Sequence, residues 1–186
     1  MHRRAGFTLV ELLITITIMV ILMTLAVFSL RSVQANARDE KRKTDITTIA
    51  RGLEQRYTNG NPKATAPTIN RGEYPSVAEF QHAQGVSQAT YTPTQITGGY
   101  MLELLPGTTK DSLIPPGSGS FSPICTSSCS VETSSVYNAA TTISKYIYEP
   151  ITSANALCLT TGCVRYNLYY RTEVDNVVHQ VRSLHQ

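Results

Sequence analysis

The sequence predicts an α+β protein in which one long N-terminal helix packs on a small antiparallel β-sheet head. Three observations lead to this prediction. A charge-free apolar run covers residues 12–30, no proline interrupts residues 7–57, and strand-like patterns dominate only after residue 143. We therefore expect the first half of the helix to lie in a membrane and the second half to pack against the head.

The composition limits the class of protein. The chain has 186 residues, of which 41% are hydrophobic and 16% are charged, and its formal net charge is +3. This length suits one domain with an extension and is too short for two full-sized domains. The apolar content excludes disorder throughout, and the nine Pro and eleven Gly exclude a coiled-coil rod. A charge of only +3 argues against a dedicated nucleic-acid binder.

Residues 7–30 read FTLVELLITITIMVILMTLAVFSL and contain one charged side chain, Glu11. As a helix they would extend roughly 36 Å, enough to cross a hydrocarbon core of about 30 Å. A secretory signal peptide has a shorter apolar run followed by a small-x-small cleavage site, which is absent here. A plain signal anchor would also fit the run, and basic residues on both sides leave its orientation open. We interpret this stretch as a membrane segment.

Glu11 is the informative residue of this segment. A carboxylate inside the bilayer costs on the order of 2.5–3.5 kcal/mol, so we expect it either to have a partner or to snorkel to the interface. No cation lies within helical reach on the apolar face. Cleavage after Gly6 would, however, create an amine on Phe7, four residues away. That amine could pair with Glu11 of the same chain or of a neighbouring copy.

Residues 5–13, AGFTLVELL, follow a short basic leader and resemble the class III signal of type IV pilins and pseudopilins. The resemblance implies that a prepilin peptidase cleaves the Gly6–Phe7 bond and that Phe7 becomes N-methylated. It also implies that Glu11 neutralises the terminal amine of a neighbouring subunit during assembly. The motif covers residues 1–30, and the rest of the chain matches only in architecture, that of a pilin-like long helix with a β-rich head.

This resemblance implies a non-enzymatic structural subunit of a type IV pilus (fimbrium) or related filament. Its expected partners are further copies of itself, a prepilin peptidase, an inner-membrane assembly platform and the membrane. The precursor would span the cytoplasmic membrane with an exported head and later join a cell-surface filament. The alternatives are a pseudopilin of a type II secretion system, a minor or competence pilin that binds DNA, and, more distantly, a membrane-anchored enzyme. Adhesion, motility, secretion and DNA uptake all stay open.

With this interpretation the chain divides into a leader (1–6), a membrane and assembly helix (7–30), an amphipathic helix (31–61) and a head (62–186). The mixed-sign run 38–43 is typical of a solvated helix face. We expect Gly52 to weaken the helix by up to about 1 kcal/mol relative to Ala. The turn signal in 59–62 ends it. The predicted apolar face consists of Ile46, Ile49, Ala50, Leu53 and Tyr57, extended by Val33 and Ala37.

The head is predicted from local patterns. Seven prolines punctuate residues 62–116, where we expect a short helix over 76–84 with a capping box from Ser76 to Glu79. Residues 101–105 read as another short helix or as an apolar docking segment. Residues 117–142 are rich in Ser and Thr and read as a surface loop. Three segments (144–149, 164–173 and 177–184) have strand patterns, and we expect them to form an antiparallel sheet of three or four strands.

The four cysteines form two close pairs, Cys125 with Cys129 and Cys158 with Cys163. In an exported head an even number favours two disulfides, for which three connectivities exist. We favour the two local pairs because each lies in a turn-like segment. Zinc is a weaker alternative, because the C-x-x-C spacing and a neighbouring His are absent, and free thiols are a third.

No other motif predicts a site. The histidines lack metal-binding spacing, and neither a nucleophile elbow nor a phosphate loop is present, so we expect no cofactor, metal or catalytic residue. The basic cluster 41–43 could contact DNA or anionic lipid, but neighbouring acidic residues dilute it. Tyr146, Tyr148 and Tyr169 could bind sugars, although packing in a sheet explains them equally well.

Overall fold

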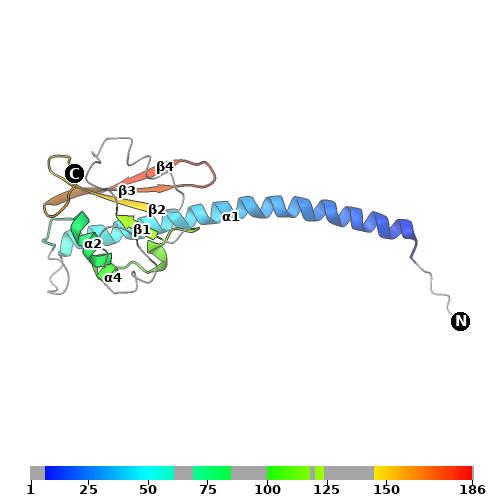
Figure 1. The fold of residues 1–186 in the computed structure, drawn as a ribbon, viewed down its shortest axis with the longest axis horizontal. Coiled ribbons are helices and arrows are strands. Elements are labelled where there is room, and N and C mark those ends of the chain that lie inside the picture. Colours follow the sequence, from blue (N-terminus) through cyan, green and yellow to red (C-terminus); the bar gives the residue numbers. More distant parts are fainter. Residues whose placement is uncertain (1–6, 61–68, 85–99, 118–119, 124–144, 186) are drawn as a thin grey trace. The chain divides into compact units, whose positions relative to one another are not determined.

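The computed structural model describes residues 7–60, 69–84, 100–117, 120–123 and 145–185 (Figure 1). Two compact units are present, residues 1–37 and residues 38–186. The elements in chain order are α1 (Leu9–Asn59), α2 (Val77–Gln84), α4 (Tyr100–Leu104), a 3-10 turn (Asp111–Leu113), β1 (Ser120–Pro123), β2 (Lys145–Thr152), β3 (Cys163–Arg171) and β4 (Val178–Arg182).

The predicted long helix is confirmed as α1, which runs without a break from Leu9 to Asn59. It ends where the sequence pattern ends it. Gly60 has a positive φ of 65°, and its N–H donates to the carbonyl oxygen of Arg56 at 2.7 Å. Glycine enters this left-handed conformation without the steric penalty that a Cβ imposes, so it terminates the helix at this point.

The apolar face of the second half of α1 is confirmed where the head covers it. Ile46, Ile49 and Leu53 are at most 1% exposed. The predicted extension of this face by Val33 and Ala37 is wrong, because both residues are exposed. They precede Arg38, at which the compact unit that forms the head begins.

The sheet has the strand order β1-β2-β3-β4. The predicted antiparallel pairing is confirmed for β2 with β3 and for β3 with β4. β1 was not predicted, and it pairs parallel with β2, with Ser120 opposite Lys145. Its sequence, SFSP, resembles the Ser-rich loop around it, because backbone pairing at a sheet edge does not require apolar alternation. The rest of the predicted loop, residues 124–142, lies outside the described residues.

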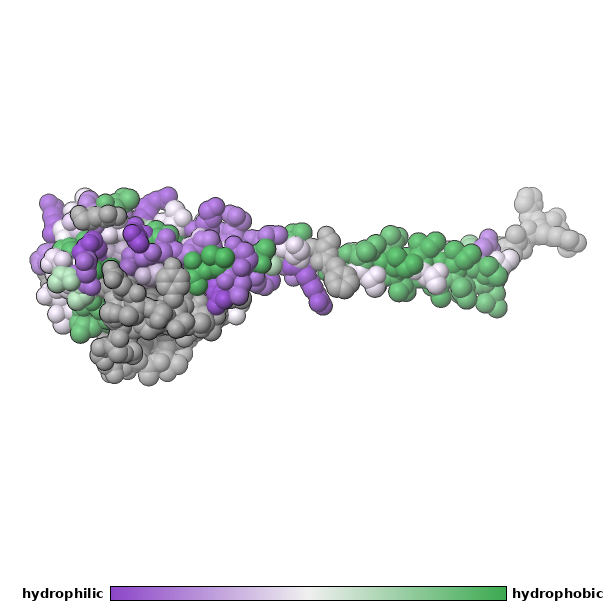
Figure 2. Space-filling view, turned by 90° about the horizontal axis from the view of Figure 1, so that it is seen from above, coloured by the Kyte–Doolittle hydropathy of each residue, from purple (hydrophilic) through white to green (hydrophobic). Residues whose placement is uncertain are grey.

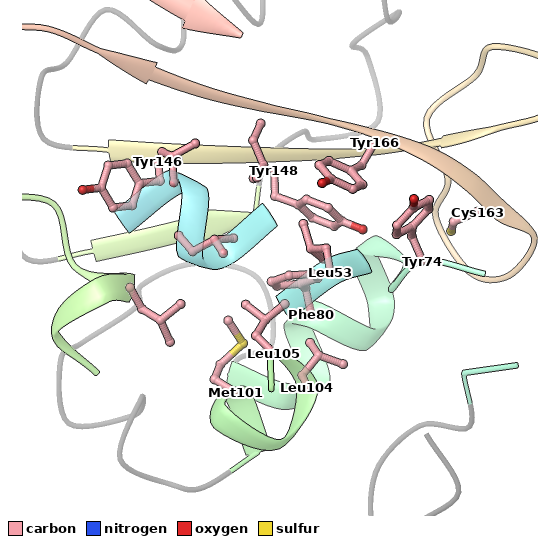
Figure 3. Packing of buried hydrophobic residues seen from close by; sticks show 14 of the residues in the cluster. Leu53, Tyr74, Phe80, Met101, Leu104, Leu105, Tyr146, Tyr148, Cys163 and Tyr166 are labelled. Atoms are coloured by element: carbon pink, nitrogen blue, oxygen red, sulfur yellow. The ribbon is translucent and has the colours of Figure 1, made fainter. Parts of the chain in front are cut away.

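The core lies between the sheet and the helices of the head (Figure 3). Tyr148 and Tyr166 lie close to Leu53 of α1 and Phe80 of α2, whereas Tyr146 lies further along β2, and all five are at most 1% exposed. The hydroxyls keep partners inside the core, since Tyr146 donates to Asp45 Oδ2 at 2.7 Å and Tyr148 to the Pro75 carbonyl at 2.7 Å. Burial of the phenols raises the pKa of both tyrosines. Packing, rather than sugar binding, therefore accounts for these two tyrosines.

The predicted capping box at the start of α2 is confirmed. Ser76 N donates to Glu79 Oε2 at 2.5 Å, and Glu79 N donates to Ser76 Oγ at 3.2 Å. The next two free N–H groups are satisfied from the loop between β2 and β3, because Val77 N donates to the Cys158 carbonyl and Ala78 N to the Leu159 carbonyl. Cys158 and Cys163 form a disulfide across this loop.

Candidate assembly site

The first half of α1 exposes apolar side chains on every side. From Leu9 to Leu25 the large hydrophobic residues range from 49% exposed at Ile14 to 81% at Leu9. Figure 2 shows this apolar surface along the visible face of the segment. By length and composition, α1 is the one helix in the described part of the chain that could cross a membrane. Water is a poor solvent for this surface, so it needs lipid or protein around it.

Its threonines do not alter this character, because each satisfies its hydroxyl within the helix. Thr15 donates to the Leu12 carbonyl at 2.8 Å, Thr17 to the Ile14 carbonyl at 2.8 Å, and Thr24 to the Ile21 carbonyl at 2.7 Å. Such back-bonding lets a hydroxyl lie in an apolar phase without an external partner. Glu11 is then the one charged side chain of residues 7–30.

Glu11 caps its own helix. Its Oε2 accepts hydrogen bonds from Thr8 N at 3.0 Å and from Thr8 Oγ1 at 2.8 Å, and Glu11 N donates to Thr8 Oγ1 at 3.2 Å. This reciprocal arrangement satisfies two of the N–H groups left free at the first turn. Both bonds to the carboxylate use Oε2, so Oε1 takes no part in them.

Thr8 is a residue that the sequence reasoning missed. The signal was present, because Thr8-Leu9-Val10-Glu11 has the same S/T-x-x-E spacing that predicted the cap at Ser76. The carboxylate therefore has a fixed position on the helix before any other molecule approaches it.

The other predicted site residues are only partly described. Phe7 directly precedes the cap and is 85% exposed, whereas Gly6 lies outside the described residues. In the unprocessed chain the Phe7 nitrogen is an amide, so it carries no charge for Glu11. The disulfide between Cys158 and Cys163 is one of the two favoured local pairs, with its Cα atoms 5.5 Å apart. Cys125 and Cys129 lie outside the described residues.

The charged run 38–43 is not simply a solvated face, and that prediction is wrong for Arg42, which is 1% exposed. Arg42 Nη1 lies 2.6 Å from Asp39 Oδ1, and its Nη2 donates to the Pro116 carbonyl at 3.0 Å. Arg38 hydrogen-bonds both oxygens of Glu173, which lowers the pKa of that carboxyl. Pro116 and Glu173 lie more than seventy residues away along the chain, so local charge patterning could not reveal them.

A metal centre finds no support among the described residues. They contain no group of three or more His, Cys, Asp or Glu side chains placed to hold an ion. The chemistry available at the described N-terminal end of α1 is therefore that of a single carboxylate, fixed by Thr8, at the edge of an apolar helix.

Comparison with known families gives the class of this N-terminal region. Residues 1–27 match the prokaryotic N-terminal methylation motif, which is the class III signal of type IV pilins and pseudopilins. The motif supports a type IV pilin-like or pseudopilin protein, a structural and non-enzymatic subunit. It implies processing by a prepilin peptidase and filament assembly, and with the apolar helix it indicates membrane anchoring. No curated protein and no solved structure was found to match the chain.

Proposed function

We propose that this protein is the structural subunit of a type IV pilus or related filament, cleaved after Gly6, N-methylated on Phe7 and assembled through the first half of α1. One observation carries the proposal. The methylation motif, residues 1–27, includes the start of a helix whose first half exposes apolar side chains on all sides in the single chain. Lipid covers such a surface before assembly, and other copies of the same helix cover it in a filament. The head would be exported and displayed on the filament surface.

Apolar packing alone does not set the register of such a filament. Lipid tails are as apolar as leucine, so a helix gains little when it exchanges lipid for neighbouring helices. A carboxylate without a partner in the same medium costs on the order of 2.5–3.5 kcal/mol. The position of Glu11 relative to a positive charge therefore discriminates between registers more sharply than the leucines do.

Processing supplies that positive charge. Cleavage at Gly6 turns the Phe7 amide into an ammonium group, which carries its charge into the membrane with the helix. Thr8 occupies Oε2 of Glu11, and Oε1 takes no part in that cap. We assign the neighbouring subunit's Phe7 ammonium to Oε1. In this arrangement Thr8 positions the carboxylate, which reduces the side-chain entropy lost when two subunits dock.

Two matched variants separate the charge from the cap. Glu11→Gln keeps an acceptor oxygen for Thr8 and removes the charge, whereas Thr8→Val removes the hydroxyl and keeps the charge. We expect Glu11→Gln to be exported and processed normally but to yield few filaments by electron microscopy. Thr8→Val should lower the filament yield much less. Normal filaments from Glu11→Gln would refute the charge pairing.

The processing site has its own test. A bulky residue in place of Gly6, as in Gly6→Val, should block cleavage, so intact mass spectrometry would find the leader still attached. Wild-type protein from the native source should lack residues 1–6 and carry one methyl group on Phe7. A native protein that retains the leader would overturn the proposed mechanism, because the ammonium group would never form.

A further inference from the structure

Four side chains in the first half of α1 enclose a shallow apolar hollow. Val20, Met23, Thr24 and Val27 line it, and its volume is about 390 Å³. These positions have the i, i+3, i+4, i+7 spacing of one helix face. The Thr24 hydroxyl adds no polar group to it, because it donates to the Ile21 carbonyl at 2.7 Å. The hollow therefore offers apolar surface, with room for one large side chain.

The hollow lies on the side of the helix opposite Glu11. Each residue of an α-helix turns the chain by about 100°, so the centre of the hollow is about 170° around the axis from Glu11. A subunit of an open filament has a neighbour on each side and presents a different patch to each of them. The Glu11 side of one copy and the hollow of the next are therefore placed to face each other.

The charge of Glu11 sets the level at which two copies meet. This step rests on the proposed function, in which Glu11 binds the Phe7 ammonium group of a neighbouring copy. All copies cross the membrane in the same direction, so residue 7 of one copy then lies level with residue 11 of the other. This offset of four residues is about 6 Å along the axis. Each residue on the Glu11 side accordingly faces the position four residues earlier in the neighbour.

At this offset one large apolar side chain meets the hollow. The hollow extends from Val20 to Val27, so it lies level with residues 24–31 of the copy that provides Glu11. Among the side chains that the structure describes in 24–31, Leu25 is the large apolar one on the Glu11 side, about 40° around the axis from Glu11. It is 63% exposed in the single chain. It would face position 21 of the neighbour, between Val20 and Thr24.

We propose that the hollow receives Leu25 of a neighbouring copy, so that each subunit inserts its own Leu25 into one neighbour and accepts the Leu25 of another. A lipid chain fills the hollow before assembly. Exchange of lipid for leucine gains little from hydrophobicity, so the contact acts through shape. It requires the same four-residue offset as the pairing of Glu11 with Phe7, and the two contacts therefore favour the same register.

Pairs of cysteines in purified filaments test this contact. Val20→Cys with Leu25→Cys places two thiols across the interface about one residue apart along the axis, within the range of a disulfide. We expect mild oxidation to give a ladder of covalent multimers on non-reducing gels. The control, Val27→Cys with Leu22→Cys, joins the same two sides of the helix but is about 14 Å out of level, so it should give no ladder. Wild-type filaments show the contribution of the native cysteines.

A change of side-chain size gives a second test, which decides the question if the cysteine pair does not assemble. Thr24→Leu fills the hollow and should lower the filament yield by about tenfold or more, because a filled site is then overpacked. Leu25→Ala in the same chain should restore most of the yield. Thr17→Leu is the control, because it makes the same change outside the hollow and about 120° from Glu11, and it should lower the yield much less.

The outcomes separate this contact from the proposed function. If wild-type protein forms filaments but the Val20 and Leu25 pair gives no ladder, or the control pair gives an equal one, the contact is overturned while the proposed function stands. Normal yield from Thr24→Leu, or no recovery with Leu25→Ala, would also overturn it and would show that another group fills the hollow. If wild-type protein keeps its leader or forms no filaments, both proposals fail.

Discussion

The two halves of α1 have the same backbone conformation but opposite surfaces. In the first half, apolar residues surround the axis and stay exposed, with Leu12 at 58% and Leu22 at 61%. In the second half they form one stripe, in which Ile49 and Leu53 are completely buried under the head. Helix formation does not distinguish the halves. The distribution of apolar residues around the axis decides whether the chain's own head or another phase covers each half.

The polar groups show the same division. In the first half, Glu11 bonds Thr8 and Thr24 bonds the Ile21 carbonyl, both only three residues away. In the second half, Asp45 bonds Tyr146 across 101 positions and Asp39 bonds the Glu173 amide across 134. The polar side chains of the first half thus find their hydrogen-bond partners within the same turn of the helix. Its exposed apolar surface must be covered by other molecules. The second half depends on the rest of its own chain.

The largest effect on folding should come from replacing Leu53, for which Leu22 provides a matched control. Leu53→Ala removes a fully buried side chain from the core and should reduce the free energy of unfolding of the head by about 2–5 kcal/mol. Leu22→Ala removes the same atoms from the exposed half and should leave that value unchanged. Urea unfolding of both variants in mild detergent, followed by near-ultraviolet circular dichroism, tests the difference. Equal losses would show that the head also covers the first half.

Loss of the Cys158–Cys163 disulfide should have the next largest effect. The loop that it closes provides the carbonyls that accept from Val77 N at 3.1 Å and from Tyr74 N at 2.7 Å. Closing so short a loop contributes about 2 kcal/mol through the unfolded chain, so Cys158→Ser with Cys163→Ser should lose about that much. Thermal unfolding measures the loss. Membrane insertion should be unaffected. It can be followed by the fluorescence of a tryptophan introduced at Leu22, since the chain has no tryptophan of its own. A change in insertion would contradict the independence of the two halves.

The sequence predicts those features of the fold that depend on neighbouring residues. The apolar run of α1, the cap of α2 and the strand pattern of β3 all follow from neighbouring residues, and the helix, the cap and the strand are each confirmed. Features that depend on distant partners were missed. The burial of Arg42 requires Glu173 and Pro116, and β1 requires its parallel neighbour β2. Neither leaves a periodic signal in its own segment.

At the candidate site the limits are different. The sequence identified Glu11 because a charge in an apolar run is conspicuous in composition. It could also have identified Thr8, since the capping spacing is local. The sequence could not show, by contrast, that the Thr8 amide and hydroxyl both donate to the same oxygen of Glu11, Oε2. Only the structure shows that Oε1 stays outside the cap.

Gly52 offers a smaller test of the buried half, and its expected sign differs from that of helix propensity. Alanine would improve the helix by up to about 1 kcal/mol. An added Cβ would, however, lie 3.1 Å from the Pro106 carbonyl oxygen and 3.3 Å from the Leu105 carbonyl carbon, both backbone atoms. Leu105 is fully buried, and overpacking typically costs about 1–3 kcal/mol, so Gly52→Ala should destabilise the head by about 1 kcal/mol net. Thr47→Ala on the exposed side of α1 is the control and should not destabilise it.

Glu149 gives the smallest expected effect, which only a pH series resolves. It is fully buried, and its Oε2 accepts from Asn167 Nδ2 at 2.9 Å and Tyr169 OH at 3.1 Å. Burial raises the pKa of this carboxyl above its ordinary value of 4.5, because the two neutral donors offset only part of the lost hydration. In the range above 4.5 the folded state therefore holds a proton that the unfolded state has released.

The sign follows from proton linkage. Below pH 4.5 both states are protonated and Glu149 imposes no penalty, while from there up to the raised folded pKa the free energy of unfolding falls as pH rises. Glu149→Gln has no proton to lose. Its free energy of unfolding relative to wild type should therefore increase from pH 4 to pH 8, as measured by urea unfolding at each pH. A pH-independent effect of the substitution would shift all these differences equally and would not change the trend. Glu40→Gln, at an exposed position of α1, makes the same charge change without burial and should show a smaller trend. If the difference in free energy of unfolding between Glu149→Gln and wild type does not change with pH, the polar groups around this carboxylate fully replace its lost water. Folding would then not be linked to proton uptake by Glu149.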